Sequence, residues 1–344
     1  MSLASEIREQ PAVLERLLRQ QAGPARAIAA AWRRQAPPFV FIAARGSSDN
    51  AALYAKYLWG ARNGTVVALA PPSLFTLYGA PPRLSRALVV GISQSGRSPD
   101  IVSVLAEGRR QGALTLAITN DPASPLAAQA DLVLDTGTGP ELSIAATKTY
   151  TAQLLAIAML STALAEDAGQ AAELERAPAL IEQTLLLDGA IASAAPAHRD
   201  MTQCAVLGRG YNFATAYEWA LKLKEIAYVV AEPYSSADFR HGPMAMVDRD
   251  FPVLAVAPGG AAFEDVMALL ERLGRERRLR LVTLSDQDRA LGLAQTPLRL
   301  PACPEWLSPL VAAVPAQLFC YHLARAKGID PEAPRGLTKV TETW

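Results

Sequence analysis

Two stretches of the chain, "FVFIAARGSSDNAALYAKYL" at residues 39–58 and "QCAVLGRGYNFATAYEWALKL" at residues 203–223, share one pattern. Each begins with an apolar strand-like run and continues through Arg-Gly, a polar turn and a helix-like segment rich in Ala, Tyr and Lys. The echo continues downstream, where "TLAITN" from Thr115 is matched by "LVTLSD" from Leu281, and "DLVLD" is matched by "PLRLP". Three features in one order, each repeated after about 165 residues, predict two copies of one structural unit.

Apolar runs alternate with longer helix-like stretches along the chain, so each copy is predicted to be a doubly wound parallel α/β sheet flanked by helices, an αβα sandwich. The expected boundaries are a helical segment at 1–30, a first domain at 31–165, a helical linker at 166–195, a second domain at 196–330 and a tail at 331–344. Open parallel sheets bind ligands beyond the carboxyl ends of their strands, so a site is expected in the loops there.

Overall composition narrows the class of protein. Lys plus Arg and Asp plus Glu number 33 each, which gives a formal net charge of zero. Because no basic tract stands out, a nucleic-acid partner is not expected. The three cysteines, Cys204, Cys303 and Cys320, are far apart and form no CxxC pair, which indicates a reduced, cytoplasmic protein without a structural metal.

No membrane attachment is predicted. The N-terminal stretch "MSLASEIREQPAVLERLLRQQ" carries charges throughout and lacks the apolar core of a signal peptide. The uncharged run from Thr149 to Ala165 touches the lower limit of length for a membrane span. Its polar residues and many alanines favour a buried helix at a domain core or a subunit contact.

The segment "GISQSGRSPD" at residues 91–100 lies between a strand-like run and a helix-like run. It offers three hydroxyls, an amide and a flexible glycine, from Ser93, Gln94, Ser95, Gly96 and Ser98. Free N–H groups at a helix N-terminus favour an oxyanion, so the loop predicts an anion site. A serine-rich loop with a helix cap would show the same residues. The second copy has "VAPGGAAFED" here, without hydroxyls, so only the first copy is expected to hold the anion.

The second copy carries the candidates for proton transfer. On a helix over "YEWALKLKEIAY", Glu218, Lys222 and Glu225 share one face, although a surface ladder of ion pairs would show the same spacing. His241 stands before Gly-Pro in a polar loop, where an imidazole can transfer protons near neutral pH. In the tail "GIDPEAPRGLTKVTETW", Lys339 can reach a substrate carbonyl and form a Schiff base. A frayed terminus is the alternative for that tail.

Taken together, these motifs resemble those of the SIS (sugar isomerase) family, in particular the isomerase half of the glucosamine-6-phosphate synthases and the stand-alone glucosamine-6-phosphate deaminases. The resemblance runs from "EIREQP" to "PRGLTK" and is most specific over "LGRG…EWALKLKEIAY…AEPYSSADFRHGPMAMVD". "SQSGRSPD" and "ELSIAATKTYTAQ" match the family's first-copy loops. It implies two tandem SIS domains that bind a phosphosugar.

The resemblance also implies residue roles. Glu225 would move the proton between C1 and C2, with electrostatic help from Lys222 and Glu218. His241 would open the sugar ring and would come from a neighbouring subunit, which implies a homodimer, and Lys339 would form the imine. No metal or organic cofactor is implied, because an aldose–ketose shift requires only acid–base groups. The residues that would bind the substrate and its phosphate are Gly46, Ser47, Ser48, Ser93, Gln94, Ser95, Ser98, Ala145 and Thr338.

Several departures from the family pattern bear on the substrate. The synthases carry an N-terminal glutaminase domain, whereas this sequence begins at the isomerase half, so glutamine-driven amination is not expected of this chain alone. Arg45 stands where the synthases have a small residue, Trp219 replaces a glycine and Ala146 a serine, which predicts a reshaped pocket.

The expected reaction is therefore conversion of glucosamine 6-phosphate to fructose 6-phosphate and ammonia. The alternatives are a deglycase for fructosamine or fructoselysine 6-phosphate, a plain phosphosugar isomerase, or a non-catalytic phosphosugar sensor. A sensor would keep the serine loop without needing Glu225, His241 and Lys339.

Overall fold

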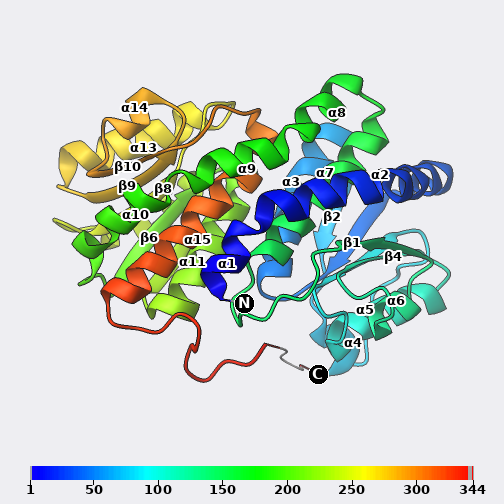
Figure 1. Cartoon of the computed structure of the whole chain (residues 1–344). Coiled ribbons are helices and arrows are strands. Elements are labelled where there is room, and N and C mark those ends of the chain that lie inside the picture. The colour runs from blue at the N-terminus through cyan, green and yellow to red at the C-terminus, as the bar shows by residue number, and fades with distance from the viewer. Residues whose placement is uncertain (1, 340–342, 344) are drawn as a thin grey trace. The chain divides into compact units, whose positions relative to one another are not determined.

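The protein is described by a computed structural model, which covers residues 2–339 and Thr343. The chain forms two compact units (Figure 1). The N-terminal unit contains Glu9–Leu142, Lys148–Arg176 and the tail from Thr338, and the C-terminal unit contains the residues up to Arg8, Ser143–Thr147 and Ala177–Leu337. The domain boundaries expected from the sequence remain a prediction.

The N-terminal unit is built on a parallel five-stranded sheet in the order β2-β1-β3-β4-β5. Its strands are β1 (Phe39–Ala43), β2 (Val66–Leu69), β3 (Leu88–Ser93), β4 (Leu114–Thr119) and β5 (Leu132–Asp135). Its helices are α2 (Gln10–Gln35), α3 (Ser47–Asn63), α4 (Ser73–Thr76), α5 (Pro99–Arg110), α6 (Pro125–Ala128), α7 (Lys148–Ala165) and α8 (Ala168–Glu175). Every residue of β3 is buried, because helices cover both faces of a parallel sheet.

The C-terminal unit repeats this design with a parallel sheet in the order β10-β9-β8-β6-β7. Its strands are β6 (Gln203–Gly208), β7 (Val230–Ser235), β8 (Pro252–Val256), β9 (Arg280–Ser285) and β10 (Thr296–Arg299). Its longer helices are α1 (Leu3–Arg8), α9 (Ala177–Leu185), α10 (Asp188–Ala194), α11 (Phe213–Ala227), α13 (Phe263–Glu276) and α15 (Ser308–Ala326). Its short ones are η1 (Ala195–His198), η2 (Gly210–Asn212), α12 (Ser236–Phe239), η3 (Pro243–Met246), α14 (Asp288–Leu291) and η4 (Glu305–Leu307).

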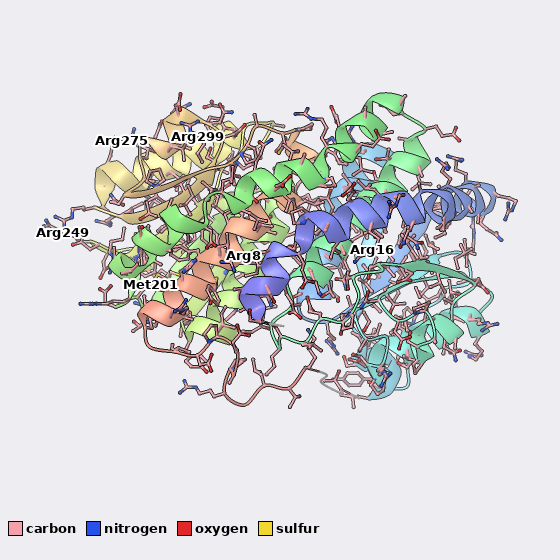
Figure 2. All side chains as sticks on the ribbon, viewed as in Figure 1. Arg8, Arg16, Met201, Arg249, Arg275 and Arg299 are labelled. Carbon is pink, nitrogen blue, oxygen red and sulfur yellow. The ribbon has the colours of Figure 1, made fainter. Side chains whose placement is uncertain are left out.

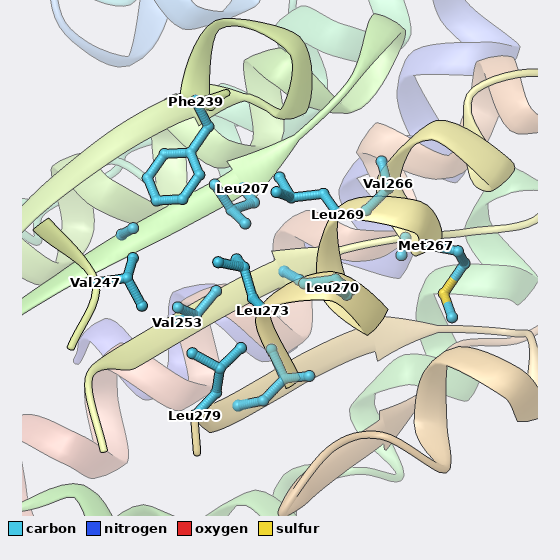
Figure 3. Packing of buried hydrophobic residues seen from close by; sticks show 14 of the residues in the cluster. Leu207, Phe239, Val247, Val253, Val266, Met267, Leu269, Leu270, Leu273 and Leu279 are labelled. Carbon is cyan, nitrogen blue, oxygen red and sulfur yellow. The ribbon is translucent and has the colours of Figure 1, made fainter. Parts of the chain in front are cut away.

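Each unit has its own apolar core. In the C-terminal unit, Leu207 of β6 and Val253 of β8 pack against Leu270 and Leu273 of α13, with Phe239 at the same cluster (Figure 3). A second cluster, in the N-terminal unit, joins β1 and β3 to α5. Burial of this apolar area is the main favourable term in folding, so each sheet is fixed by the helices that cover it.

The two sheets have the same strand order, which confirms the predicted α/β repeat. Read from the edge, β2-β1-β3-β4-β5 corresponds strand for strand to β7-β6-β8-β9-β10. In both, the order reverses next to the first strand of the unit, between β1 and β3 and between β6 and β8. Open α/β sheets bind ligands beyond the carboxyl ends of the strands at such a reversal.

Two apolar helices fill the interiors. Among the described residues, one helical segment, Glu305–Ala326, is long and apolar enough to cross a membrane by length and composition, and 89% of its most apolar window is buried. Helix α7 is buried at every residue from Lys148 to Thr162. Both are core helices, as the sequence predicted for the uncharged run over α7.

Surface charges are balanced locally. In the C-terminal unit, Arg249, Arg275 and Arg299 project outward (Figure 2). Arg299 pairs with Asp288, and Arg249 lies 3.8 Å from an oxygen of Asp250. Exposed ion pairs of this kind add little to the free energy of unfolding, and their main effect is to keep the local surface charge close to neutral.

One buried imidazole makes stability depend on pH. His198 is buried, its Nε2 lies 2.9 Å from Thr296 Oγ1, and its ring packs edge-on against Phe319. Burial, helped by the nearby Arg280 cation, lowers the pKa of His198 below its ordinary value of 6.5. His198 is buried because η1 packs on α15.

We expect the His198→Gln variant to lose less stability on acidification than the wild type. Below pH 6.5 the unfolded chain takes up a proton at this position while the folded protein does not, so the free energy of unfolding falls until the pH passes the lowered folded pKa. Urea titrations at about pH 7.5 and about pH 5.5 measure this difference. Equal losses in the two proteins would contradict the prediction.

Candidate functional site

The predicted anion loops lie at the switch point of the N-terminal sheet. Strands β1 and β3 are neighbours, with Ala43 opposite Gly91, so the loops that follow them emerge at the same edge. Each loop leads directly into a helix, α3 at Ser47 and α5 at Pro99. The serine hydroxyls of both loops are therefore presented at one edge of the sheet, where they can donate hydrogen bonds to a phosphate. The amides in the first turn of α5 are already engaged, because the Asp100 amide donates to the Thr343 carbonyl and the Ile101 amide donates to Asp100 Oδ1.

The loop after β3 is tightly folded around Gly96. Gly96 has φ +62°, and a Cβ atom there would lie only 2.1 Å from the Ser124 hydroxyl, so a side chain is excluded on two grounds. The Gly96 amide donates to Ser93 Oγ (3.1 Å) and the Arg97 amide donates to Ser95 Oγ (3.3 Å). These hydroxyls accept from the backbone within the loop, and their own protons can be offered to a bound anion.

Ser98 occupies the N-cap position of α5 in an extended conformation. Its side chain makes no capping hydrogen bond in α5, as far as the described chain shows. The alternative explanation of the loop as a serine helix cap is therefore not supported at Ser98.

The loop after β1 contributes the second group of residues to the candidate anion site. Gly46 has φ +55° and precedes α3, whose first residues are Ser47 and Ser48. The Ser48 hydroxyl is buried and accepts a hydrogen bond from Gln153 Nε2 of α7 (3.0 Å). This bond fixes the Ser48 rotamer, so its hydroxyl is oriented before any ligand arrives.

An ion pair joins the two loops. Arg45 Nε donates to Asp100 Oδ2 across 2.8 Å, and the Asp100 side chain is 0% exposed whereas that of Arg45 is 51% exposed. The same Asp100 oxygen accepts a hydrogen bond from Thr343 Oγ1 in the C-terminal tail (2.8 Å). Arg45, the residue that departs from the family pattern, therefore connects β1, α5 and the tail.

Lys339 also binds the N-terminal unit. Its Nζ lies 2.6 Å from Glu141 Oε2, and Glu141 is 0% exposed. Glu141 accepts two further hydrogen bonds from Thr149, from the amide (3.1 Å) and from the hydroxyl (2.8 Å). In this structure the predicted imine-forming amine is engaged in an ion pair. The sequence did not single out Glu141, because nothing local distinguishes it from a surface carboxylate.

The corresponding position of the C-terminal unit is filled by the protein itself. The amides of Ala261 and Ala262, just before α13, donate to the Glu305 carboxylate at 2.7 and 3.2 Å. Gly260 has φ +149°, and a Cβ atom there would come within 2.4 Å of Glu305. An internal carboxylate thus takes the place that a phosphate would occupy, which explains why this copy can do without hydroxyls.

Helix α11 presents a buried triad of charges. Lys222 Nζ lies 2.5 Å from Glu225 Oε2 and 3.4 Å from Glu218 Oε1. The side chains of Lys222 and Glu218 are each 3% exposed, and that of Glu225 is 23% exposed. The alternative of a solvated surface ladder is wrong, because α11 packs against α15 and only the Glu225 end reaches solvent.

This triad orients one carboxylate group for chemistry. The Lys222 ammonium lies between the two carboxyl groups and contacts both of them. Its contact to Glu225 Oε2 holds that side chain in place at the partly exposed end of the group. A buried ion pair is costly unless it is fully paired, so such an arrangement favours a functional role over a stabilising one.

His241 lies in an exposed loop held by α13. Its amide donates to the Asp238 carbonyl at 3.0 Å, and the next residue, Gly242, has φ +137°. The neighbouring Arg240 is bound to Asp265 of α13 at 2.8 Å, which anchors the loop. Within the part of the chain that the structure describes, no hydrogen bond or ion pair joins His241 to Glu225.

Two further predicted residues lie away from the loops. Trp219 is fully buried and packs edge-on against Phe319, with ring centroids 5.7 Å apart. The expectation that Trp219 reshapes a pocket stays a prediction. Ala145 belongs to a short segment of the C-terminal unit, whereas Thr338 and the serine loops belong to the N-terminal unit.

We expect Gly96→Ala to weaken binding of a phosphosugar far more than Gly64→Ala. Both glycines have nearly the same positive φ, +62° and +63°, so both variants carry the same backbone strain. Only at Gly96 does the new methyl group collide with Ser124 and distort the anion loop. Calorimetric titration with fructose 6-phosphate measures the effect, and equal affinities in the two variants would contradict it.

Comparisons with known proteins find similar chains. A family model described as SIS domain matches residues 35–163 and 199–326. The isomerizing glutamine–fructose-6-phosphate aminotransferase of Thermococcus kodakarensis is 36% identical over 309 residues, which are 87% of this chain and 51% of that protein. The chain thus spans about half the length of the curated relatives it matches.

Solved structures agree in fold. A Silicibacter pomeroyi protein, for which phosphosugar isomerase activity has been suggested, is 36% identical with a TM-score of 0.88 over 96% of this chain and 100% of that one. The C-terminal domain of a Francisella tularensis glucosamine-fructose-6-phosphate aminotransferase is 29% identical with a TM-score of 0.85, covering 95% and 96%. A Thermotoga maritima glucosamine-6-phosphate deaminase is 22% identical with a TM-score of 0.82 and shares the fold over 100% of both chains.

Proposed function

The chain belongs to the SIS domain family, and from this premise we propose that it is a phosphosugar isomerase acting on amino sugars. The proposed reaction converts glucosamine 6-phosphate and water to fructose 6-phosphate and ammonia. The observation that carries the proposal is the buried Glu218–Lys222–Glu225 group of α11, which leaves one carboxylate end accessible. A phosphosugar sensor would have no need to bury this charge group.

The substrate class is supported by the anion loops and by the relatives. A cluster of serine hydroxyls and the Gln94 amide at one sheet edge can donate hydrogen bonds to a phosphate monoester. The two aminotransferases named above act on fructose 6-phosphate and transfer an amino group, according to their names. Deamination is the reverse of amino transfer to fructose 6-phosphate: water replaces the amino group at C2, and the nitrogen leaves as ammonia.

The central step is a proton shift between two carbons. In the open-chain aldose, the Glu225 carboxylate removes the proton from C2, and the electron pair moves towards the C1 carbonyl oxygen. The same carboxyl group returns the proton to C1 while one N–H proton of the C2 amine passes to O1, which leaves a hydroxyl at C1 and an imine at C2. The Lys339 amine then adds to that imine and ammonia leaves, and water hydrolyses the resulting Schiff base to the C2 ketone. A carboxylate held by one ammonium contact can serve as base and then as acid.

The other proposed roles follow the family pattern. His241 opens the sugar ring before the proton shift, and as an exposed loop residue it would act on a neighbouring copy in a homodimer. Lys339 exchanges with the substrate nitrogen to form a Schiff base at C2, which water then hydrolyses. In this role the amine must first leave Glu141. Ser47, Ser48, Ser93, Gln94, Ser95 and Ser98 bind the phosphate and adjacent hydroxyls.

The test is ammonia release from a panel of 6-phosphorylated amino sugars and fructosamines. Glucosamine 6-phosphate should yield ammonia and fructose 6-phosphate in equal amounts. Cleavage of a fructosamine 6-phosphate alone would favour a deglycase, and aldose–ketose exchange without any nitrogen release would favour a plain isomerase. Binding of phosphosugars without turnover of any of them would leave only a sensor.

A further inference from the structure

The C-terminal tail has two described attachment points on the N-terminal unit. Lys339 is bound to Glu141, and four residues later Thr343 is bound to Asp100. Both partners are buried carboxylates presented by the segments around α7 and α5. The tail is therefore not a frayed end at either of these positions.

The contact at Asp100 is a two-point clamp. Thr343 Oγ1 donates to Asp100 Oδ2 at 2.8 Å, and the Thr343 carbonyl accepts from the Asp100 amide at 3.2 Å. The remaining bonds of the carboxylate come from the Ile101 amide to Oδ1 (2.9 Å) and from Arg45 Nε to Oδ2 (2.8 Å). The side chain and the main chain of Asp100 thus hold the hydroxyl and the carbonyl of Thr343.

Because the Asp100 carboxylate is buried, it depends on the hydrogen bonds that Arg45 and Thr343 donate to it. A carboxylate with 0% exposure is costly unless hydrogen bonds replace its water, and Arg45 and Thr343 supply two of those bonds. Asp100 also lies in the first turn of α5, where the helix dipole favours a negative charge. Arg45 extends from the loop after β1 and fixes the carboxylate orientation that Thr343 meets.

We propose that Arg45 and Asp100 form a permanent seat for the tail, so that Lys339 can leave Glu141 for the substrate while Thr343 stays bound. Four residues of chain span at most about 14 Å, so a seated Thr343 confines Lys339 to the neighbourhood of the anion loop. Tethering of this kind raises the effective concentration of the amine at its target. Arg45 is then a positioning residue that acts through Asp100, and the idea rests on the proposed role of Lys339.

A protease assay tests the seat without relying on activity. Trypsin cleaves after Lys339, and the Thr343→Val variant should be cleaved there about tenfold to a hundredfold faster than the wild type, the effect of losing one hydrogen bond to a buried charged group. Thr343→Ser keeps the hydroxyl and serves as the matched control. Equal cleavage rates in Thr343→Val and Thr343→Ser would overturn the proposal.

Kinetics separate positioning from phosphate binding. With glucosamine 6-phosphate, Arg45→Ala should lower kcat in parallel with faster tail cleavage while KM stays within about twofold, and Arg45→Lys should restore part of both. A rise in KM with unchanged kcat and unchanged cleavage would assign Arg45 to the phosphate and overturn its role in the seat. If the wild type releases no ammonia, the proposed function fails, and the cleavage rates still decide whether the seat exists.

Discussion

Glu225→Gln should lower kcat for glucosamine 6-phosphate by about 10²- to 10⁴-fold and leave KM nearly unchanged. The amide has the size of the carboxylate and can still accept the hydrogen bond from Lys222, so the packing of α11 is kept. What disappears is the group that accepts the C2 proton and returns it to C1. Steady-state rates of ammonia release measure kcat, and loss of solvent exchange at C2, followed by NMR in deuterium oxide, assigns the defect to proton transfer.

Glu232→Gln is the matched control for this substitution. Glu232 is exposed on β7, so the same chemical change there removes one surface charge without touching α11. Its rate should stay within about twofold of the wild type. A Glu225→Gln enzyme that keeps most of its activity would show that another group moves the proton and would remove the basis of the proposed mechanism.

The architecture was predictable because it depends on hydrophobic patterns and turn residues that are close together in the sequence. The α/β repeat followed from apolar runs and turns at a fixed offset, and parallel sheets buried on both faces give continuous apolar strands. The switch-point location of the serine loops followed from the same pattern, because β1 and β3 had to be neighbours once the doubly wound order was assumed. Such features depend on residues close together in sequence.

The contacts that decide the site were not predictable in this way. Glu141 meets Lys339 across 198 residues, Asp100 meets Thr343 across 243, and Glu305 reaches back to the amides before α13. In each case a carboxylate of ordinary sequence context gains its role from a partner that only the fold supplies. The spacing of Glu218, Lys222 and Glu225 likewise fitted a surface ladder, and only packing against α15 shows that the group is buried.

Lys339→Met should abolish nitrogen chemistry while leaving a phosphosugar able to bind. We expect ammonia release to fall by on the order of a hundredfold or more, because the thioether cannot form the Schiff base that the proposed route passes through. Borohydride reduction in the presence of fructose 6-phosphate should attach the sugar to Lys339 in the wild type and leave the variant unmodified, as read by peptide mass spectrometry. A plain isomerase would instead retain aldose–ketose exchange in Lys339→Met.

Lys339→Arg separates the chemical role of this side chain from its role in holding the tail. The guanidinium can still pair with Glu141, whose two carboxylate oxygens suit a bidentate contact, but it cannot act as an amine nucleophile at neutral pH. We therefore expect Lys339→Arg to be as inactive as Lys339→Met towards glucosamine 6-phosphate, while hydrogen exchange of the tail stays at the wild-type rate only in Lys339→Arg. If Lys339→Arg retained full activity, Lys339 would be a structural cation, and the Schiff-base step would have to be abandoned.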